Sequence, residues 1–130
     1  MERLTNYEIV MDIEWIKNIT GADQYFEIIF STKDRKEYKI IFERVWDMRW
    51  SIENASIARW YDLRSCLPER IVDSSIYVIE DSEYIRYFEQ QVMGTRPIDE
   101  LKHYIISDTT DTTLDILAVK KPVLVGPISI

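Results

Sequence analysis

The chain has 130 residues, of which 46% are hydrophobic, and this supplies enough apolar side chain for one core and one domain over residues 1–130. It carries 23 acidic and 16 basic residues, and the net charge of −7 repels the phosphate backbone of DNA and RNA. We therefore expect no nucleic-acid partner, whereas the same charge would attract a basic protein.

The N-terminal region carries two competing patterns. Alternate residues from Tyr7 to Trp15 are apolar, as in a strand. A second apolar set fits one face of a helix and consists of Ile9, Ile13, Ile16 and Thr20. We predict a strand or coil as far as Asp12, followed by a short helix over residues 13–19 that ends at Gly21.

The next segments predict a hairpin. Residues 25–31 are aromatic and β-branched, and the polar residues 33–36 that follow are typical of a turn. From Tyr38 to Glu53 the even positions are apolar apart from Arg44, whereas most odd positions are polar. This alternation indicates a strand with one buried face, which we expect to pair with the strand before it.

The alternating segment is too long for one straight strand. At the usual rise per residue it would extend about 50 Å, so we expect a bend at residues 44–47. Trp46 and Trp50 lie on its apolar face and are expected to fill the core. Truncating Trp50 to alanine is then expected to cost about 3–5 kcal/mol.

Further strands are expected after this segment. Residues 55–63 continue the meander until the Leu-Pro-Glu sequence at 67–69 interrupts it, because proline cannot donate a hydrogen bond to a sheet. Residues 74–80 are apolar at successive positions, which is typical of a central strand covered on both faces.

The apolar period then becomes helical. Asp81 or Ser82 is suited to cap the first turn, and Gly94 is suited to end the last one. We predict a helix over about 82–93.

Two β-rich runs at 101–107 and 113–119 flank a polar loop and predict a second hairpin, and residues 123–125 add a short last strand. The expected fold class is α+β, a mainly antiparallel sheet of about five to eight strands with the one helix packed on it.

Few residues are suited to catalysis or metal binding. His103 is the single histidine and lies in a predicted strand, where a structural role competes with a nucleophile pair formed with Cys66. Asp108, Asp111 and Asp115 could hold a metal, but they lack the calcium-loop pattern, and Asp is common in polar turns. We favour the structural histidine and the turn.

The glycines also argue against a phosphate-binding loop. Gly21, Gly94 and Gly126 are far apart in the sequence, whereas such a loop needs glycines close together. We therefore expect no cofactor, no metal and no catalytic residue that can be named. Neighbouring carboxylates are better explained as solvated faces and caps.

Aromatic residues are concentrated between residues 38 and 61. Trp and Tyr are enriched at the energetic centres of protein interfaces, and acidic neighbours would attract a basic partner. We predict a partner-binding surface made of Asp47, Glu53, Trp60, Tyr61 and Asp62.

Three segments carry a resemblance to known proteins. Residues 75–84, 87–91 and 102–106, followed by Asp115-Ile116-Leu117, resemble the recurring core of small uncharacterised proteins of Gram-positive bacteria. Some acidic proteins of this kind are similar to immunity proteins, which bind and silence a toxin. The resemblance implies a binding role and carries no catalytic residue with it.

The sequence therefore favours a non-enzymatic protein-binding module, with neutralisation of a basic toxin as the specific hypothesis. Two alternatives remain: a β domain that binds a small ligand, and an enzyme that uses dispersed carboxylates. The single cysteine cannot close an internal disulfide bond, and neither a secretory signal nor an apolar run of membrane-spanning length is visible. We expect a cytoplasmic monomer or homodimer with no membrane partner.

Overall fold

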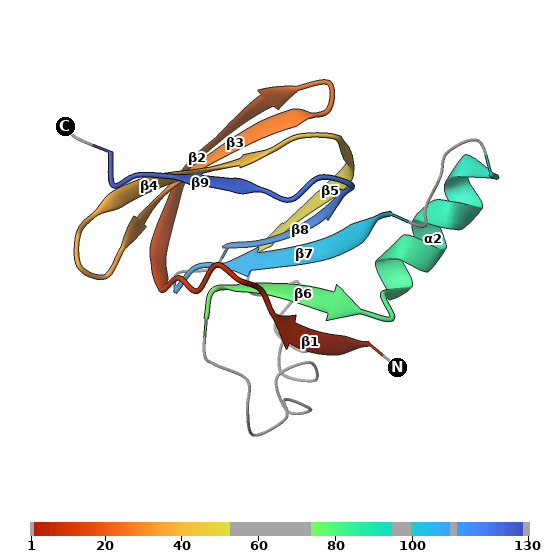
Figure 1. Cartoon of the computed structure of the whole chain (residues 1–130), viewed down its shortest axis with the longest axis horizontal. Coiled ribbons are helices and arrows are strands. Elements are labelled where there is room, and N and C mark those ends of the chain that lie inside the picture. Colours follow the sequence, from red (N-terminus) through yellow and green to blue (C-terminus); the bar gives the residue numbers. More distant parts are fainter. Residues whose placement is uncertain (1, 53–73, 95–99, 110–111, 129–130) are drawn as a thin grey trace.

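A computed structural model of the chain describes residues 2–52, 74–94, 100–109 and 112–128. These residues form two antiparallel sheets and one helix, which confirms the α+β class (Figure 1). The described strands number nine, more than the five to eight expected. Within this part of the chain, no helix has the length and apolarity needed to cross a membrane.

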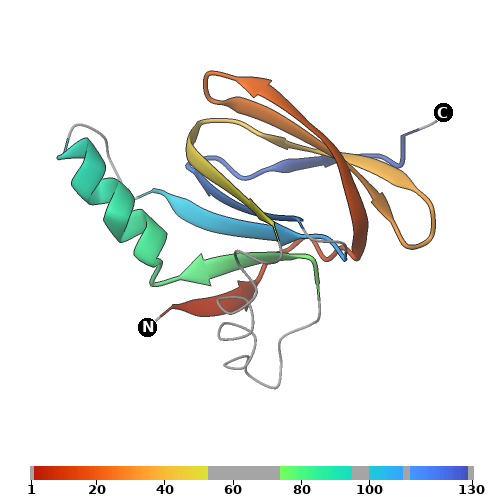
Figure 2. The same cartoon turned by 180° about the vertical axis from the view of Figure 1, so that it is seen from behind.

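The two sheets face each other around a shared core (Figure 1, Figure 2). The five-stranded sheet has, in spatial order, β1 (Arg3–Asn6), β6 (Ile76–Glu80), β7 (Lys102–Ser107), β8 (Thr112–Ala118) and β5 (Val45–Ile52). The four-stranded sheet has β2 (Ile13–Ala22), β3 (Tyr25–Thr32), β4 (Glu37–Phe42) and β9 (Val123–Val125). Helix α2 (Glu83–Val92) packs on the face of the five-stranded sheet that is turned away from this core.

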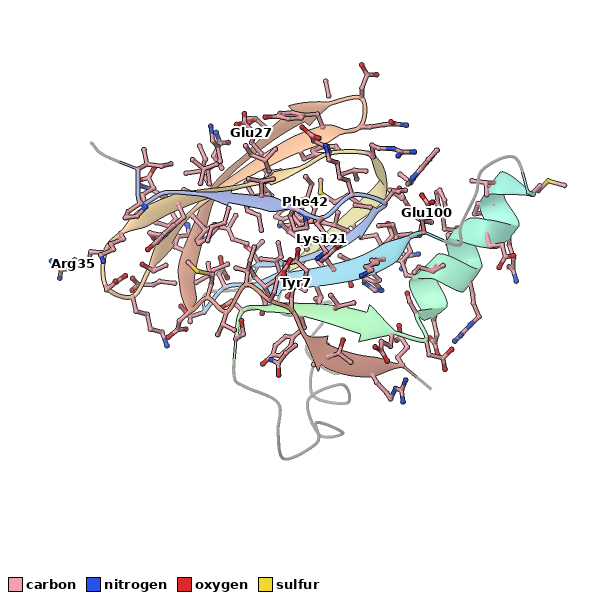
Figure 3. The ribbon with its side chains drawn as sticks, viewed as in Figure 1. Tyr7, Glu27, Arg35, Phe42, Glu100 and Lys121 are labelled. Atoms are coloured by element: carbon pink, nitrogen blue, oxygen red, sulfur yellow. The ribbon has the colours of Figure 1, made fainter. Side chains whose placement is uncertain are left out.

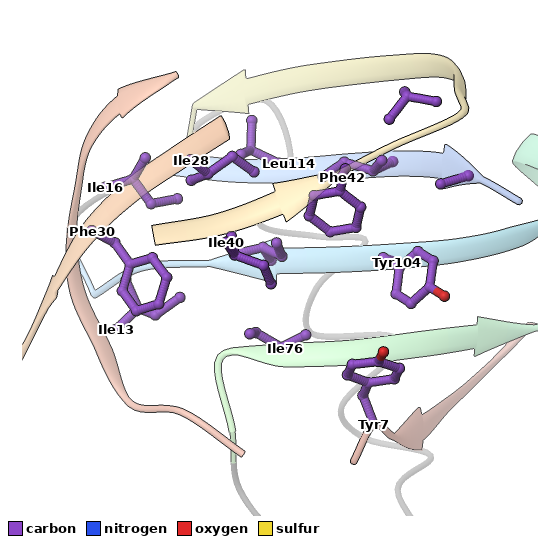
Figure 4. Close-up of a cluster of buried hydrophobic side chains, with 14 residues drawn as sticks. Tyr7, Ile13, Ile16, Ile28, Phe30, Ile40, Phe42, Ile76, Tyr104 and Leu114 are labelled. Atoms are coloured by element: carbon purple, nitrogen blue, oxygen red, sulfur yellow. The ribbon is translucent and has the colours of Figure 1, made fainter. Parts of the chain in front are cut away.

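The main core lies between the sheets and is built from alternate residues of each strand. Ile40 and Phe42 of β4 are fully buried, as the even-position pattern predicts. Other fully buried members are Ile13, Ile28, Phe30, Ile76, Tyr104, Ile106, Leu114 and Ile116, most of which are labelled in Figure 4.

The helix predicted over residues 13–19 is wrong, because this segment is part of strand β2. β2 pairs with β3 along its length, but the register shifts between Ile13 and Trp15 and again between Ile16 and Asn18. Each shift changes which side the next residue faces, so that Ile13, Ile16 and Ile19 all pack against the core. An inward residue at every third position imitates the period of a helix.

The bend expected at residues 44–47 is confirmed and takes the chain from one sheet to the other. β4 ends at Phe42, Arg44 has a φ of 53°, and β5 begins at Val45 in the five-stranded sheet. The register with β8 shifts between Val45 and Asp47. The bend therefore joins two strands that never share a sheet.

The prediction that Trp50 fills the core is wrong, because the chain changes sheet before it. Trp50 is 63% exposed, although Met48 on the same face of β5 packs against the main core. Trp46 is partly buried, but against the smaller cluster beside the helix rather than between the sheets. The alternation is real, but the second sheet does not extend far enough to cover the whole apolar face of β5.

The remaining local predictions agree with the structure. The Ser82 side chain caps α2 by accepting a hydrogen bond from the backbone N–H of Ile85. The helix ends in the left-handed conformation at Met93, one residue before the predicted stop at Gly94. β7 and β8 form the predicted hairpin, and β6 is buried on both faces at Ile76 and Tyr77. Residues 55–63 and 67–69 lie outside the described residues.

Gly21 gives a first stability prediction. A Cβ atom at this position would overlap the carbonyl oxygen of Tyr25 and lie 2.9 Å from the Cα atom of Phe26, so the hairpin backbone would have to move. Gly21→Ala should therefore lower the free energy of unfolding by about 2 kcal/mol in denaturant melts. The control is Thr20→Ala, an exposed change on the same strand that should cost less than about 0.5 kcal/mol. Equal losses would contradict the backbone approach at Gly21.

Candidate functional site

Three buried polar side chains form a row between helix α2 and the five-stranded sheet. His103 Nε2 lies 2.6 Å from Asp115 Oδ1, and His103 Nδ1 lies 2.7 Å from Ser82 Oγ. The three residues are at most 5% exposed. His103 and Asp115 come from the paired strands β7 and β8, and Ser82 is the N-cap of the helix.

Each ring nitrogen of His103 has a partner. Nε2 is hydrogen-bonded to the Asp115 carboxylate, and Nδ1 shares a hydrogen bond with the hydroxyl group of Ser82. The Ser82 oxygen in turn accepts the N–H of Ile85. Both ring nitrogens and the hydroxyl group are thus hydrogen-bonded inside the protein.

The row contains the same three groups as a serine hydrolase triad, but its surroundings favour a structural role. A nucleophile has to reach a substrate, whereas Ser82 is 5% exposed and its oxygen caps the helix. We interpret the row as a clamp that ties the first turn of α2 to the sheet. The structural interpretation of His103 is therefore supported, while Cys66 lies outside the described residues.

The two described aspartates suspected of metal binding, Asp108 and Asp115, make separate hydrogen bonds. Asp108 accepts hydrogen bonds from the backbone N–H groups of Ile16 and Thr112, each at 3.0 Å, which confirms its role in the turn. Asp115 points to the clamp, and Asp111 lies outside the described residues. In the described ranges, no three His, Cys, Asp or Glu side chains are grouped as metal ligands would be.

Next to the clamp, strand β5 and helix α2 share an exposed surface. The Tyr84 hydroxyl donates to Asp47 Oδ2 at 2.7 Å, and the Arg49 guanidinium carbon lies 3.8 Å from the centre of the Tyr84 ring. The same carbon is 5.3 Å from the ring centre of Tyr87, which is 50% exposed. Together with Trp50, which is exposed on the opposite face of the same strand, these residues form what we call the β5–α2 surface.

Hydrogen bonds and charges of Asp47 and Arg49 stabilise this surface. Burial raises the pKa of Tyr84, and the hydrogen bond to the Asp47 carboxylate raises it further, while Arg49 opposes the shift. The phenol therefore remains a hydrogen-bond donor at neutral pH. Arg49 also stands directly opposite Asp115 in the register of β5 and β8, so its cation offsets the buried carboxylate of the clamp.

Among the described strands, β5 lies at an edge of its sheet. It ends the order of the five-stranded sheet, and no described strand pairs with the side of β5 that faces away from β8. An edge of this kind offers backbone N–H and C=O groups to another chain. The exposed Trp50 ring is attached to this edge.

The structure places one of the five predicted site residues, Asp47, on the β5–α2 surface. Glu53, Trp60, Tyr61 and Asp62 lie outside the described residues. The sequence prediction missed Arg49, Tyr84 and Tyr87. Two signals were available for them: Tyr84 and Tyr87 are three apart on a helix, and Arg49 lies on the polar side of the alternating strand.

The chain matches no protein-family model, no curated protein and no solved structure. The resemblance to immunity proteins therefore stays a prediction, and a functional proposal has to rest on the geometry of the described residues.

Proposed function

We propose that this chain is a non-enzymatic protein-binding module that contacts its partner through the β5–α2 surface. The observation that carries the proposal is that Tyr87 of the helix is exposed beside Arg49 of β5, and that Trp50 is exposed on the other face of β5, which lies at the edge of the described sheet. Trp, Tyr and Arg are the residue types most enriched where interfaces gain their binding energy. A basic protein is the partner class we favour, and a toxin neutralised by this chain is the specific candidate.

The surface is organised before any partner arrives. The Arg49 side chain lies over the Tyr84 ring, which is itself fixed by its hydrogen bond to Asp47. An arginine held in this way loses less conformational entropy on binding than a free one. Its planar group still has donors available for a carboxylate or carbonyl oxygen of a partner.

The edge of strand β5 and the net charge of the chain also favour a protein partner. A partner segment can add a strand to the side of β5 that no described strand occupies, and the exposed rings then supply specificity. The net charge of −7 speeds the encounter with a basic protein and slows it with an acidic one.

The test compares immobilised variants against a purified partner, and the product of the neighbouring gene is the first protein to use. Trp50→Ala should raise the dissociation rate about tenfold or more, and Arg49→Ala should also raise it. The matched control is Trp15→Ala, since Trp15 is 53% exposed but belongs to β2 in the other sheet. Equal dissociation rates for all three variants would show that another surface carries the contact.

Ionic strength separates the charge argument from the aromatic one. The association rate with a basic partner should fall as salt is raised, whereas the effect of Trp50→Ala on dissociation should persist. An association rate that is indifferent to salt would contradict the proposed basic partner. Failure of the neighbouring gene product to bind would remove the toxin hypothesis.

A further inference from the structure

Strand β5 has a regular edge over most of its length. Its register with β8 is continuous from Asp47 to Ile52. The other strands that end a described sheet are shorter or irregular, since β1 has 4 residues, β9 has 3, and β2 carries two register shifts. Short strands and bulges protect an edge against pairing with another chain. Among the described strands, β5 is therefore the edge best suited to accept a further strand.

The beginning of this edge is covered by the chain itself. The backbone N–H of Val45 donates to the carbonyl oxygen of Gln24 at 3.0 Å. Gln24 lies in the turn between β2 and β3. Because this N–H bonds to the turn and not to β8, the turn lies on the outer side of β5. An added strand can therefore pair with β5 only beyond Val45.

The charges of β5 match those of a second, antiparallel copy of the same strand. Two identical strands paired in this way are related by a twofold axis, and one residue stands opposite its own copy. With Met48 on the axis, Asp47 of each copy stands opposite Arg49 of the other, which gives two pairs of opposite charge. With Asp47 or Arg49 on the axis, two like charges would face each other. With Trp50 on the axis, Arg49 would face the uncharged Ser51.

The pairing centred on Met48 also covers Trp50. Phe42, at the end of β4, lies between the two sheets (Figure 3), whereas Trp50 is 63% exposed on the same side of its own sheet. In the pairing, Trp50 of one copy stands opposite Trp46 of the other, next to Val45 and the turn that covers it. The twofold axis keeps both four-stranded sheets on one side. The turn of the second copy would therefore pack on the exposed indole ring.

We propose that two copies of this chain associate through β5, as antiparallel strands centred on Met48, so that their five-stranded sheets join into one. Backbone hydrogen bonds hold the two strands together, and the pairs of Asp47 with Arg49 select the register. The proposal does not rest on the function proposed above, because it needs no other protein. A partner strand would occupy the same edge, so that a second copy and such a partner exclude each other there.

The test is sedimentation velocity of the full chain by itself. Because the paired segment is short, we expect a dissociation constant on the order of tens of micromolar, and the mass should rise from one chain to two between about 5 µM and about 500 µM. Trp50→Ala should weaken the dimer about tenfold. The matched control is Trp15→Ala, an exposed tryptophan of β2 in the other sheet, which should leave the dissociation constant unchanged.

Charge reversal tests the register. Asp47→Lys and Arg49→Glu each place two pairs of like charge across the axis, so either variant alone should remain a monomer. An equimolar mixture of the two variants should form the dimer again, because every facing pair then has opposite charges. Circular dichroism checks that each variant folds. If one of them does not, Asp47→Asn and Arg49→Gln replace them, and each of these should weaken the dimer about threefold or more.

Three results would overturn the proposal. The first is a chain that sediments as a monomer up to about 500 µM, well above the expected dissociation constant. The second is a dimer that Trp50→Ala and Trp15→Ala weaken equally. The third is a dimer whose strength does not respond to the charges of Asp47 and Arg49, either in the mixture or in the neutral variants. No partner protein enters these measurements, so their failure leaves the function proposed above to its own test.

Discussion

Replacing His103 with alanine should lower the free energy of unfolding by about 3–5 kcal/mol. His103 is fully buried and hydrogen-bonded through both ring nitrogens, to Asp115 and to Ser82. Without the ring, the buried Asp115 carboxylate loses the hydrogen bond to Nε2, and the helix cap loses its connection to the sheet. Urea unfolding followed by circular dichroism measures the loss.

Companion variants show whether the loss comes from the clamp. Asp115→Asn keeps an oxygen that accepts the Nε2–H of His103, so it should cost clearly less than His103→Ala. The double variant His103→Ala with Asp115→Ala should lose less than the sum of the single variants, because both single variants break the same hydrogen bond. Additive losses, or a cost below about 1 kcal/mol for His103→Ala, would mean that the row does not hold the helix to the sheet.

Sequence patterns correctly predict those elements that depend on residues close together in the chain. The cap at Ser82, the helix after it and the hairpin of β7 and β8 depend on residues close to one another in the chain. Strand β2 was mispredicted, because two register shifts in its pairing with β3 decide which of its residues point inward. Its isoleucines at every third position are what a helix would also show.

The sites depend on longer-range arrangements. His103 stands opposite Leu117 in the hairpin register, so its contact with Asp115 is a diagonal one, and Ser82 reaches the ring only through the packing of the helix. Asp47 was predicted from its neighbours in the sequence, but its hydrogen bond to Tyr84 depends on where the helix docks. The spacing of residues in the sequence therefore predicts neither the contacts of His103 nor the hydrogen bond between Asp47 and Tyr84.

The exposure of Trp50 has the same origin. The alternating pattern runs through Phe42 and Trp50 alike, yet the chain changes sheet between them. Phe42 stays between the sheets, where its ring contacts the Tyr104 ring at a centroid distance of 5.5 Å. Trp50 lies beyond the region that the second sheet covers.

These two aromatic residues therefore give opposite expectations for one substitution. Phe42→Ala should cost about 3–5 kcal/mol, because it opens a cavity among fully buried side chains. Trp50→Ala should cost less than about 1 kcal/mol, because little of its ring surface is removed from water. Parallel denaturant melts at one pH measure both losses. A small cost makes Trp50→Ala a clean probe of the β5–α2 surface, since any loss of partner binding then comes from the contact and not from unfolding. If Trp50→Ala costs as much as Phe42→Ala, the ring is buried in solution and the proposed binding surface loses its central aromatic residue.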